Sequence, residues 1–366
     1  CPLRGYLYGH SANNKEPPCG DTSMAIRPII GKEKTMEGKF RFGIMGAGNI
    51  TRQFCDAVQR TGIAVVAAVA GRTPGKAAKL AGEFQIPGVY EDYEEMLKKE
   101  QLDAVYIAVT TNAHYELAML CLDYRMPVLC EKAMFRTYQE AKTVFDRSSQ
   151  LGVFVMEGMW SRFLPKMAAI RRWIAEGRIG KVTMAQVDIG FQAPLDPQNR
   201  YFNRDLGGGA MYDLTVYCYD ILTGIMEKPV KEVDIQTIWT DTDVDGAELL
   251  QVKMDGCLAR LAASFLTDMG DKAVFFGSKG RIEMKNPHYG QECWLYEDGK
   301  EPEVFAEDHE ENGFVYEIRE VVNCVRSGAI ESQVAPHSMT LEASRLYDRI
   351  LETKEAAEVI SLSELA

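Results

Sequence analysis

The chain has 366 residues, of which 46% are hydrophobic and 26% charged, as in globular proteins that bury a large core. Its formal net charge of −12 argues against nucleic acid or an anionic membrane as the main partner, because both bind basic surfaces. No apolar run approaches the roughly 18 residues that a membrane-spanning helix requires.

Residues 1–35 carry no hydrophobic periodicity and lack the apolar stretch of a signal peptide. Met36 stands just before a clean strand pattern. We therefore expect residues 1–35 to be a flexible leader or a translation artefact, dispensable for folding and activity. On this view Met36 is the natural start.

From Lys39 onward, strand and helix patterns alternate. Strands are predicted at 40–46, 63–70, 103–110, 127–132 and 153–159. Helices are predicted between them at 49–60, 75–84, 114–124 and 138–150. Such alternation predicts an α/β domain with a doubly wound parallel sheet, covered on both faces, over residues 36–160.

After about residue 180 the pattern changes to strands joined by short polar turns. Strands are predicted at 182–191, 230–239, 247–254, 257–266, 272–277, 280–285 and 293–298, and helices at 163–176, 208–223, 312–327 and 337–355. Short connections indicate an open, mainly antiparallel sheet. We expect residues 161–366 to form a substrate-binding and oligomerisation domain whose last helices pack back on the first domain.

A sheet with only one face covered by helices leaves the other face free for a partner. We therefore expect a homo-oligomer, most simply a homodimer, joined through this open sheet. The apolar run Leu261–Leu266 is the expected contact.

The nine cysteines are spaced irregularly and include no Cys-x-x-Cys pair, which fits neither a disulfide framework nor a zinc site. The five histidines show no paired spacing, so no metal is expected. We expect reduced cysteines and a cytoplasmic location. A thiol nucleophile is a weaker alternative, because no histidine stands at a suggestive spacing.

The segment GIMGAGNIT at 43–51 joins the first predicted strand to the first helix. Gly46 and Gly48 match the first two glycines of G-x-G-x-x-G, and Thr51 replaces the third. Asn49 and Ile50 open the helix, whose free N–H groups suit a phosphate. The motif predicts dinucleotide binding, and a simple tight turn is the alternative.

The end of the second predicted strand distinguishes NADP from NAD. No Asp or Glu stands between Asp56 and Glu83, whereas NAD binders usually place an acid there. Arg72 occupies this region, and a guanidinium can bind a 2′-phosphate with two hydrogen bonds. We predict NADP, with NAD as the alternative cofactor. A solvated arginine at a strand end is the competing interpretation of Arg72.

The helix that follows Gly207–Gly209 carries Asp213, Tyr217 and Asp220 at positions i, i+4 and i+7. Residues at this spacing share one helix face. We expect the face to line a cleft, with solvent as the alternative. The three glycines are expected to let the backbone approach a ligand.

Ordered motifs along the chain resemble the glucose–fructose oxidoreductase/inositol dehydrogenase (Gfo/Idh/MocA) family. They are GAGNI at 46–50, AGRTPGKA at 70–77, VTTNAHYELA at 109–118, CEKA at 130–133, MEGMWSRF at 156–163, GGGAMYDLTVY at 207–217 and ENGFVYEIREVVNCVRSG at 311–328. The resemblance covers about 39–355. Two of the motifs, at 156–163 and 207–217, are most similar to the branch that includes dimeric dihydrodiol dehydrogenase and NADP-linked xylose dehydrogenase.

The resemblance implies an enzyme that moves a hydride between nicotinamide and a secondary alcohol or carbonyl of a sugar, polyol or dihydrodiol. It gives catalytic roles to Lys132 and Tyr217, and a role in substrate binding or catalysis to Asp213. A lysine ammonium near a tyrosine lowers the phenol pKa from its usual ~10, so Lys132 is expected to assist Tyr217. Which of the two carries the proton stays open.

The resemblance also implies cofactor contacts from Thr110, Asn112, His114 and Glu131, with helix capping as an equal alternative for His114. On the substrate side it implies Trp160, Arg162 and Phe163, with helix packing and an exposed arginine as the alternative. Where the family usually has Glu-Lys-Pro, this chain has Ala133 after Lys132.

A non-enzymatic regulator that binds dinucleotide with the same fold is the competing hypothesis. A member that holds its cofactor tightly without net redox chemistry is a third. Lys132, Asp213 and Tyr217 are all present, which favours the enzyme.

Overall fold

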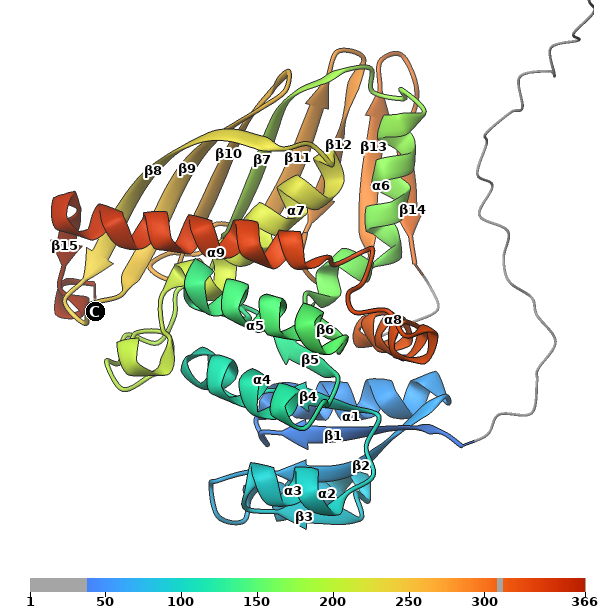
Figure 1. The fold of residues 1–366 in the computed structure, drawn as a ribbon. Helices are drawn as coiled ribbons and strands as arrows, with labels where there is room; N and C mark the ends of the chain where they lie inside the picture. Colours follow the sequence, from blue (N-terminus) through green and yellow to red (C-terminus); the bar gives the residue numbers. More distant parts are fainter. Residues whose placement is uncertain (1–37, 308–311, 366) are drawn as a thin grey trace, which may run out of the picture. The chain divides into compact units, whose positions relative to one another are not determined.

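Six parallel strands form the first sheet of the computed structural model, which describes residues 38–307 and 312–365 (Figure 1). Their order is β3-β2-β1-β4-β5-β6. The strands are β1 (Phe40–Met45), β2 (Ala64–Ala70), β3 (Gly88–Tyr90), β4 (Ala104–Ile107), β5 (Val128–Glu131) and β6 (Val155–Gly158). The helices between them are α1 (Asn49–Thr61), α2 (Lys76–Phe84), α3 (Tyr93–Lys99), α4 (His114–Asp123) and α5 (Tyr138–Leu151).

The strand order reverses at β1, which pairs with β2 on one side and with β4 on the other. In doubly wound sheets a ligand binds outside the carboxyl ends of the strands at such a switch point. The expected parallel sheet is thereby confirmed, and it predicts a site beside Gly46 and the end of β4.

The second sheet has nine strands in the order β14-β13-β12-β11-β7-β10-β9-β8-β15. They are β7 (Val182–Gly190), β8 (Val230–Thr240), β9 (Asp245–Met254), β10 (Cys257–Ser264), β11 (Lys272–Gly277), β12 (Gly280–Lys285), β13 (Glu292–Glu297), β14 (Glu303–Ala306) and β15 (Glu358–Ile360). Only the β10–β7 and β15–β8 pairs are parallel. The sheet is therefore mainly antiparallel, as expected.

Helices α6 (Pro165–Ala175), α7 (Val216–Met226) and α9 (His337–Glu352) lie on one face of this sheet (Figure 1). Helix α9 also packs on α5, and α8 (Phe314–Ser327) packs on α1. The side-chain amide of Asn312, just before α8, donates to Gln53 O and to Asp56 Oδ2, each at 2.8 Å. The last two long helices, α8 and α9, thus pack on α1 and α5, which cover the parallel sheet.

Several short elements were not predicted. These are β3, α3, β14 and β15, and a single π-helical turn at Met211–Thr215 that precedes α7. Elements of three to seven residues are too short for a hydrophobic period to be read from the sequence. The π turn shifts the phase of the helix between Asp213 and Tyr217, so i, i+4 spacing alone does not give their relative direction.

Within residues 38–307 and 312–365, no helix is long and apolar enough to cross a membrane. The seven cysteines of this part are free, and six are buried. A cytoplasmic location stays a prediction from the sequence. The predicted leader, 1–35, lies outside the described residues.

Candidate active site

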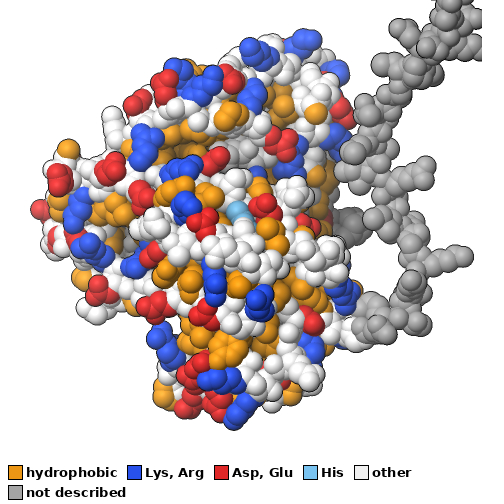
Figure 2. Space-filling view, viewed as in Figure 1, with side chains coloured by type: hydrophobic (Ala, Val, Ile, Leu, Met, Phe, Trp, Pro, Cys, Tyr) orange, Lys and Arg blue, Asp and Glu red, His pale blue; other side chains and the backbone are white. Residues whose placement is uncertain are grey.

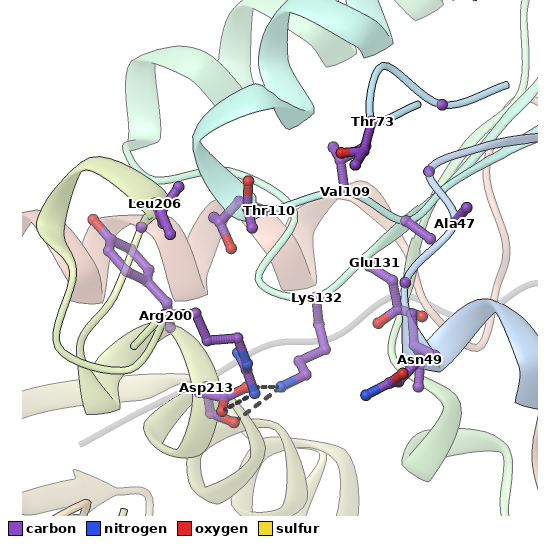
Figure 3. A pocket seen from close by; sticks show the side chains of 18 of the residues that line it. Ala47, Asn49, Thr73, Val109, Thr110, Glu131, Lys132, Arg200, Leu206 and Asp213 are labelled. Carbon is purple, nitrogen blue, oxygen red and sulfur yellow. Dashed lines mark hydrogen bonds and ion pairs between the residues drawn. The ribbon is translucent and has the colours of Figure 1, made fainter. Parts of the chain in front are cut away.

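A cavity of about 710 Å³ lies at the carboxyl edge of the parallel sheet (Figure 3). One wall comes from the loops after β1, β2, β4 and β5, and the other from Trp160 and the segment 200–217. On the face of the molecule shown in Figure 2, basic and acidic side chains are interspersed over the surface. The cavity therefore sits where the strand order predicts a ligand.

The glycine loop forms the floor of one end of the cavity. Gly46 has a φ of +111°, and a Cβ there would lie 2.3 Å from Ala108 O, so only glycine fits. A Cβ on Gly48 would meet no described atom within 4 Å, so this position leaves room for a ligand. Thr51, in place of the third glycine, is fully buried, and its hydroxyl donates to Gly48 O at 2.5 Å.

Helix α1 begins at Asn49 with no side-chain cap and no acid in its first turn. Its first N–H groups are therefore free for an anion, and the helix dipole favours negative charge there. Asn49 and Ile50 both line the cavity, as expected. The loop fits the pyrophosphate of a dinucleotide.

The end of β2 contributes Arg72, Thr73 and Lys76 to the cavity. The lining contains only two carboxylates, Glu131 and Asp213, and both come from other segments. The guanidinium of Arg72 lies 5.8 Å from the centre of the Tyr93 ring. The surroundings of Arg72 are thus cationic and suit a phosphate.

At the opposite end, Asp213 lies between two cations (Figure 3). Lys132 Nζ is 2.6 Å from Asp213 Oδ1 and donates to its carbonyl oxygen at 3.0 Å, while Arg200 Nη2 is 3.0 Å from Oδ2. Burial alone would raise the pKa of Asp213, but Lys132 and Arg200 lower it to about 2. Burial would lower the pKa of Lys132, yet Asp213 and Tyr217 raise it to about 12. All three groups are therefore charged at neutral pH.

Tyr217 lies beside this cluster, with Lys132 Nζ 4.5 Å from the centre of its ring. Its hydroxyl accepts a hydrogen bond from Trp160 Nε1 at 2.9 Å. Burial raises the pKa of Tyr217 to about 12, and the opposing effect of Lys132 is smaller. Lys132 thus lowers the phenol pKa, as expected, but burial outweighs it, and the charges of Glu131 and Asp213 also raise the pKa.

The segment that follows Lys132 is held from two sides. His114 is buried, with Nδ1 3.1 Å from Ala133 O and Nε2 3.1 Å from Val109 O. Glu157 accepts from the N–H of Met134 at 2.9 Å. The Lys132–Ala133 peptide is cis. His114 thus braces the backbone beside the cavity instead of lining it, which departs from the expected cofactor contact.

Among the other expected cofactor residues, Thr110 and Glu131 line the cavity and Asn112 does not. The Asn112 side chain accepts from the Thr110 hydroxyl at 2.6 Å. Glu131 is buried and accepts from the hydroxyl of Tyr106. Burial raises the pKa of Glu131 to about 7, although the Tyr106 hydrogen bond opposes this.

Of the expected substrate residues, Trp160 and Asp213 line the cavity, and Arg162 and Phe163 do not. Arg162 Nη1 is 2.5 Å from Asp220 Oδ1, and its Nε donates to Val334 O at 2.6 Å. Phe163 packs against the core. The predicted polar face therefore divides: Asp213 and Tyr217 line the cavity, but Asp220 is buried with Arg162.

The three glycines before Asp213 make way mainly for protein atoms. A Cβ on Gly209 would lie 2.2 Å from Asp245 Oδ1, and one on Gly208 would lie 2.7 Å from Arg200 O. Gly207 alone of the three lines the cavity. The expectation that this run lets the backbone approach a ligand is therefore corrected for Gly208 and Gly209.

Sequence reasoning missed several lining residues. They are Gln53, Lys76 and Tyr93 of the first three helices, Tyr212 of the π turn, and Arg200, Tyr201 and Leu206 before the glycine run. Arg200 is the most important of them, because it holds Asp213. Its only signal was a charged residue shortly before a glycine run. Within the described chain, no group of three or more His, Cys, Asp or Glu side chains could hold a metal ion.

A Rossmann sheet whose glycine loop, free helix N-terminus and lysine–tyrosine pair meet in one cavity defines a nicotinamide-dependent oxidoreductase. Residues 40–159 match the GFO_IDH_MocA family model, described as an oxidoreductase family with an NAD-binding Rossmann fold. Residues 167–283 match the GFO/IDH/MocA C-terminal domain. The chain belongs to the Gfo/Idh/MocA oxidoreductase family, which confirms the resemblance seen in the sequence.

Curated relatives include trans-1,2-dihydrobenzene-1,2-diol dehydrogenases. The mouse (Mus musculus) protein is 31% identical over 332 residues, covering 88% of this chain and 97% of the relative. The human (Homo sapiens) protein is 29% identical over 336 residues, covering 87% and 97%.

Solved structures share the fold. The aldose-aldose oxidoreductase from Caulobacter crescentus superposes with a TM-score of 0.80 at 21% identity, covering 87% of this chain and 98% of that one. KijD10, a 3-ketoreductase from Actinomadura kijaniata in complex with NADP and TDP-benzene, gives 0.79 at 22%, covering 88% and 99%. Levoglucosan dehydrogenase in complex with NADH and levoglucosan gives 0.79 at 16%, covering 87% and 98%.

The Arg162–Asp220 pair yields a test of structure against substrate binding. Replacement of Arg162 by leucine leaves Asp220 buried without its cation, which should lower the free energy of unfolding by about 3–5 kcal/mol. The Michaelis constant for substrate should change little. Chemical denaturation and steady-state kinetics measure the two effects.

The double variant Arg162→Leu/Asp220→Leu is the matched control, and it should be more stable than the single variant because no buried charge is left unpaired. A single variant of normal stability with a raised Michaelis constant would instead place Arg162 at the substrate.

Proposed function

We propose that the protein is an NADP-dependent dehydrogenase or reductase that interconverts a secondary alcohol and a carbonyl on a diol, sugar or polyol. The observation that carries the proposal is the juxtaposition of the Lys132 ammonium and the Tyr217 ring in a cavity whose other end fits a dinucleotide. The substrates in the names of the relatives, a dihydrodiol and several sugars, support the substrate class.

Lys132 and Tyr217 are suited to hold the reacting oxygen. An ammonium has three N–H donors, and Asp213 takes two of those of Lys132. The hydroxyl of Tyr217 accepts from Trp160, so its own hydrogen is available to a substrate oxygen. A bound nicotinamide dinucleotide supplies the hydride donor or acceptor. The chain then supplies two donors that stabilise negative charge on the substrate oxygen.

The pKa values of the pair indicate how it handles the proton. Lys132 and Tyr217 both have a pKa raised to about 12, so both are protonated at neutral pH. Reduction of a carbonyl therefore finds its proton donor in place. Oxidation of an alcohol needs one of the pair to give up its proton first, and it becomes easier as the pH rises.

Replacement of Lys132 by alanine tests the catalytic pair. Loss of acid–base assistance is worth roughly 10²–10⁴-fold, so turnover should fall by that order while NADP still binds. The turnover of Tyr217→Phe should fall by a similar factor. The loss of turnover in the double variant should be much smaller than the product of the two single losses, because the residues act as one unit. Absorbance of reduced nicotinamide follows turnover, and nucleotide fluorescence follows binding.

Lys99→Ala, at an exposed lysine of α3, is the matched control and should keep normal turnover. Near-normal turnover of Lys132→Ala would remove the basis of the proposal, because the ammonium would then take no part in the chemistry. A wild-type protein that binds dinucleotide but turns over no alcohol or carbonyl would favour the regulator.

We infer NADP preference from Arg72. The residue lines the cavity at the end of β2 beside Lys76, and no carboxylate of that strand end lines it. Arg72→Ala should raise the Michaelis constant for NADP roughly 10- to 100-fold, the equivalent of a charge-assisted hydrogen bond, and should change that for NAD little. Initial rates with both cofactors measure this. Equal effects on the two would show that Arg72 does not bind the 2′-phosphate.

We also propose a homodimer through the open face of the nine-stranded sheet. Leu258, Met184 and Phe276 face each other across β10, β7 and β11. They are 54%, 48% and 39% exposed, an unusual run of apolar side chains on a surface. The expected contact at Leu261–Leu266 is corrected, because Leu261, Ala263 and Phe265 are buried.

A charge in the middle of this row should separate the subunits. Met184→Asp should give a monomer at micromolar concentration by light scattering, because a carboxylate would have to be desolvated in the interface. Val89→Asp, at a 44% exposed apolar residue of β3, is the control and should leave the dimer intact. A wild-type protein that is monomeric would refute the proposal.

A further inference from the structure

The loop between β12 and β13 does not line the cavity itself, but its His288 packs against Tyr217, which does. Four hydrogen bonds fix its turn. Asn286 N donates to Asp271 O at 3.0 Å, and Asn286 O accepts from Tyr289 N at 3.1 Å, from Gly290 N at 2.6 Å and from the buried Lys166 Nζ at 3.3 Å. A loop held in this way presents its side chains in one conformation. His288 is the residue that it directs toward Tyr217.

The ring of His288 lies against that of Tyr217, with centroids 4.9 Å apart and planes at 33°. Tyr289 packs edge-on against the other side at 4.5 Å. Nδ1 is buried without a hydrogen bond and lies 3.9 Å from Asp271 Oδ2. Nε2 makes no hydrogen bond in the described part of the chain, and unlike Nδ1 it is not fully buried.

The surroundings of His288 set its charge and tautomer. Burial lowers its pKa to about 3, and the positive charges of Lys132 and Lys166 act in the same direction. The imidazole is therefore neutral, with one N–H and one lone pair. Asp271 is oriented by the N–H of Gly190, which donates to Oδ1 at 2.9 Å. Its negative charge favours the proton on Nδ1 and leaves the lone pair on Nε2.

This lone pair is chemically distinct from the groups around it. Lys132 and Tyr217 offer hydrogen-bond donors near the reacting oxygen, and the single N–H of Trp160 is already donated to the Tyr217 hydroxyl. The carboxylate of Asp213 is occupied by Lys132 and Arg200. Donors suit a carbonyl or alkoxide oxygen, but a second hydroxyl on the neighbouring carbon has a hydrogen that needs an acceptor. The unpartnered Nε2 beside Tyr217 can supply it.

We propose that His288 is a specificity-determining residue whose Nε2 accepts a hydrogen bond from the second hydroxyl of a vicinal diol while the first reacts at Lys132 and Tyr217. The inference rests on the proposed function and narrows its substrate class to adjacent hydroxyls. A mono-alcohol leaves Nε2 unpartnered in the complex, which costs affinity and rate relative to the diol.

The test compares trans-1,2-cyclohexanediol with cyclohexanol, with NADP as oxidant. Wild type should prefer the diol in kcat/KM, and His288→Leu should lose roughly 10- to 100-fold on the diol while its kcat/KM for cyclohexanol changes little. His288→Gln, which can place an amide oxygen near the position of Nε2, should recover much of the loss. Tyr289→Phe, on the same loop and 49% exposed, is the matched control and should keep the wild-type ratio.

Equal losses on both alcohols in His288→Leu, or an unchanged diol preference, would overturn the proposal. Calorimetric titration of the diol into the enzyme with oxidised cofactor separates this result from failure of the proposed function. Diol binding that depends on His288 without turnover would leave the inference standing and refute the dehydrogenase. Turnover that does not depend on His288 would support the dehydrogenase and refute the inference about His288.

Discussion

The carboxylate of Asp213 is the group on which the chemistry of the cavity depends. It joins Lys132 from the parallel sheet to Arg200 from the other wall, and the cluster retains one net positive charge. Two buried acids fix the π turn that carries Asp213. Asp245 accepts a hydrogen bond from the N–H of Met211 at 2.6 Å, and Glu248 accepts one from the Thr215 hydroxyl. Two layers of polar contacts thus set the position of the Lys132 ammonium.

The two ends of the cavity differ in how far their charged groups are exposed to solvent. At the dinucleotide end, Arg72 and the free N-terminus of α1 stay open to an anion. At the other end, Lys132, Asp213 and Tyr217 are largely shielded from solvent, so each acts strongly on its neighbours, whereas the Arg200 side chain is 54% exposed. On the proposed function, the first region supplies affinity for the cofactor and the second supplies the chemistry.

Features fixed by local backbone chemistry could be predicted from the sequence. The glycine loop is one, because Gly46 needs a positive φ and α1 must start directly after it. The strand–helix alternation and the lysine at the end of β5 are others. Each depends on neighbouring residues alone, and the family resemblance added the pairing of Lys132 with Tyr217.

Features that depend on partners distant in the chain could not be predicted. Arg162 lies within the motif at 156–163, but its position depends on an ion pair with Asp220, 58 residues later in the chain. The contact of Arg200 with Asp213 depends on how the loop before the glycine run folds. The pKa of Tyr217 depends on how deeply the phenol is buried, which the sequence does not show. His288 had no motif at all, since the fold alone brings it against Tyr217.

The contact of α8 with α1 has a consequence for how the chain is made. Asn312 binds Gln53 across 259 residues of sequence, so one side of the first Rossmann helix gains its cover only when the last part of the chain has been synthesised. Pairings of such separation form late, because a long loop must close first. During translation the segment with the parallel sheet would emerge first, and the face of α1 that α8 later covers would stay exposed. Nascent chains of this protein are therefore expected to bind chaperones.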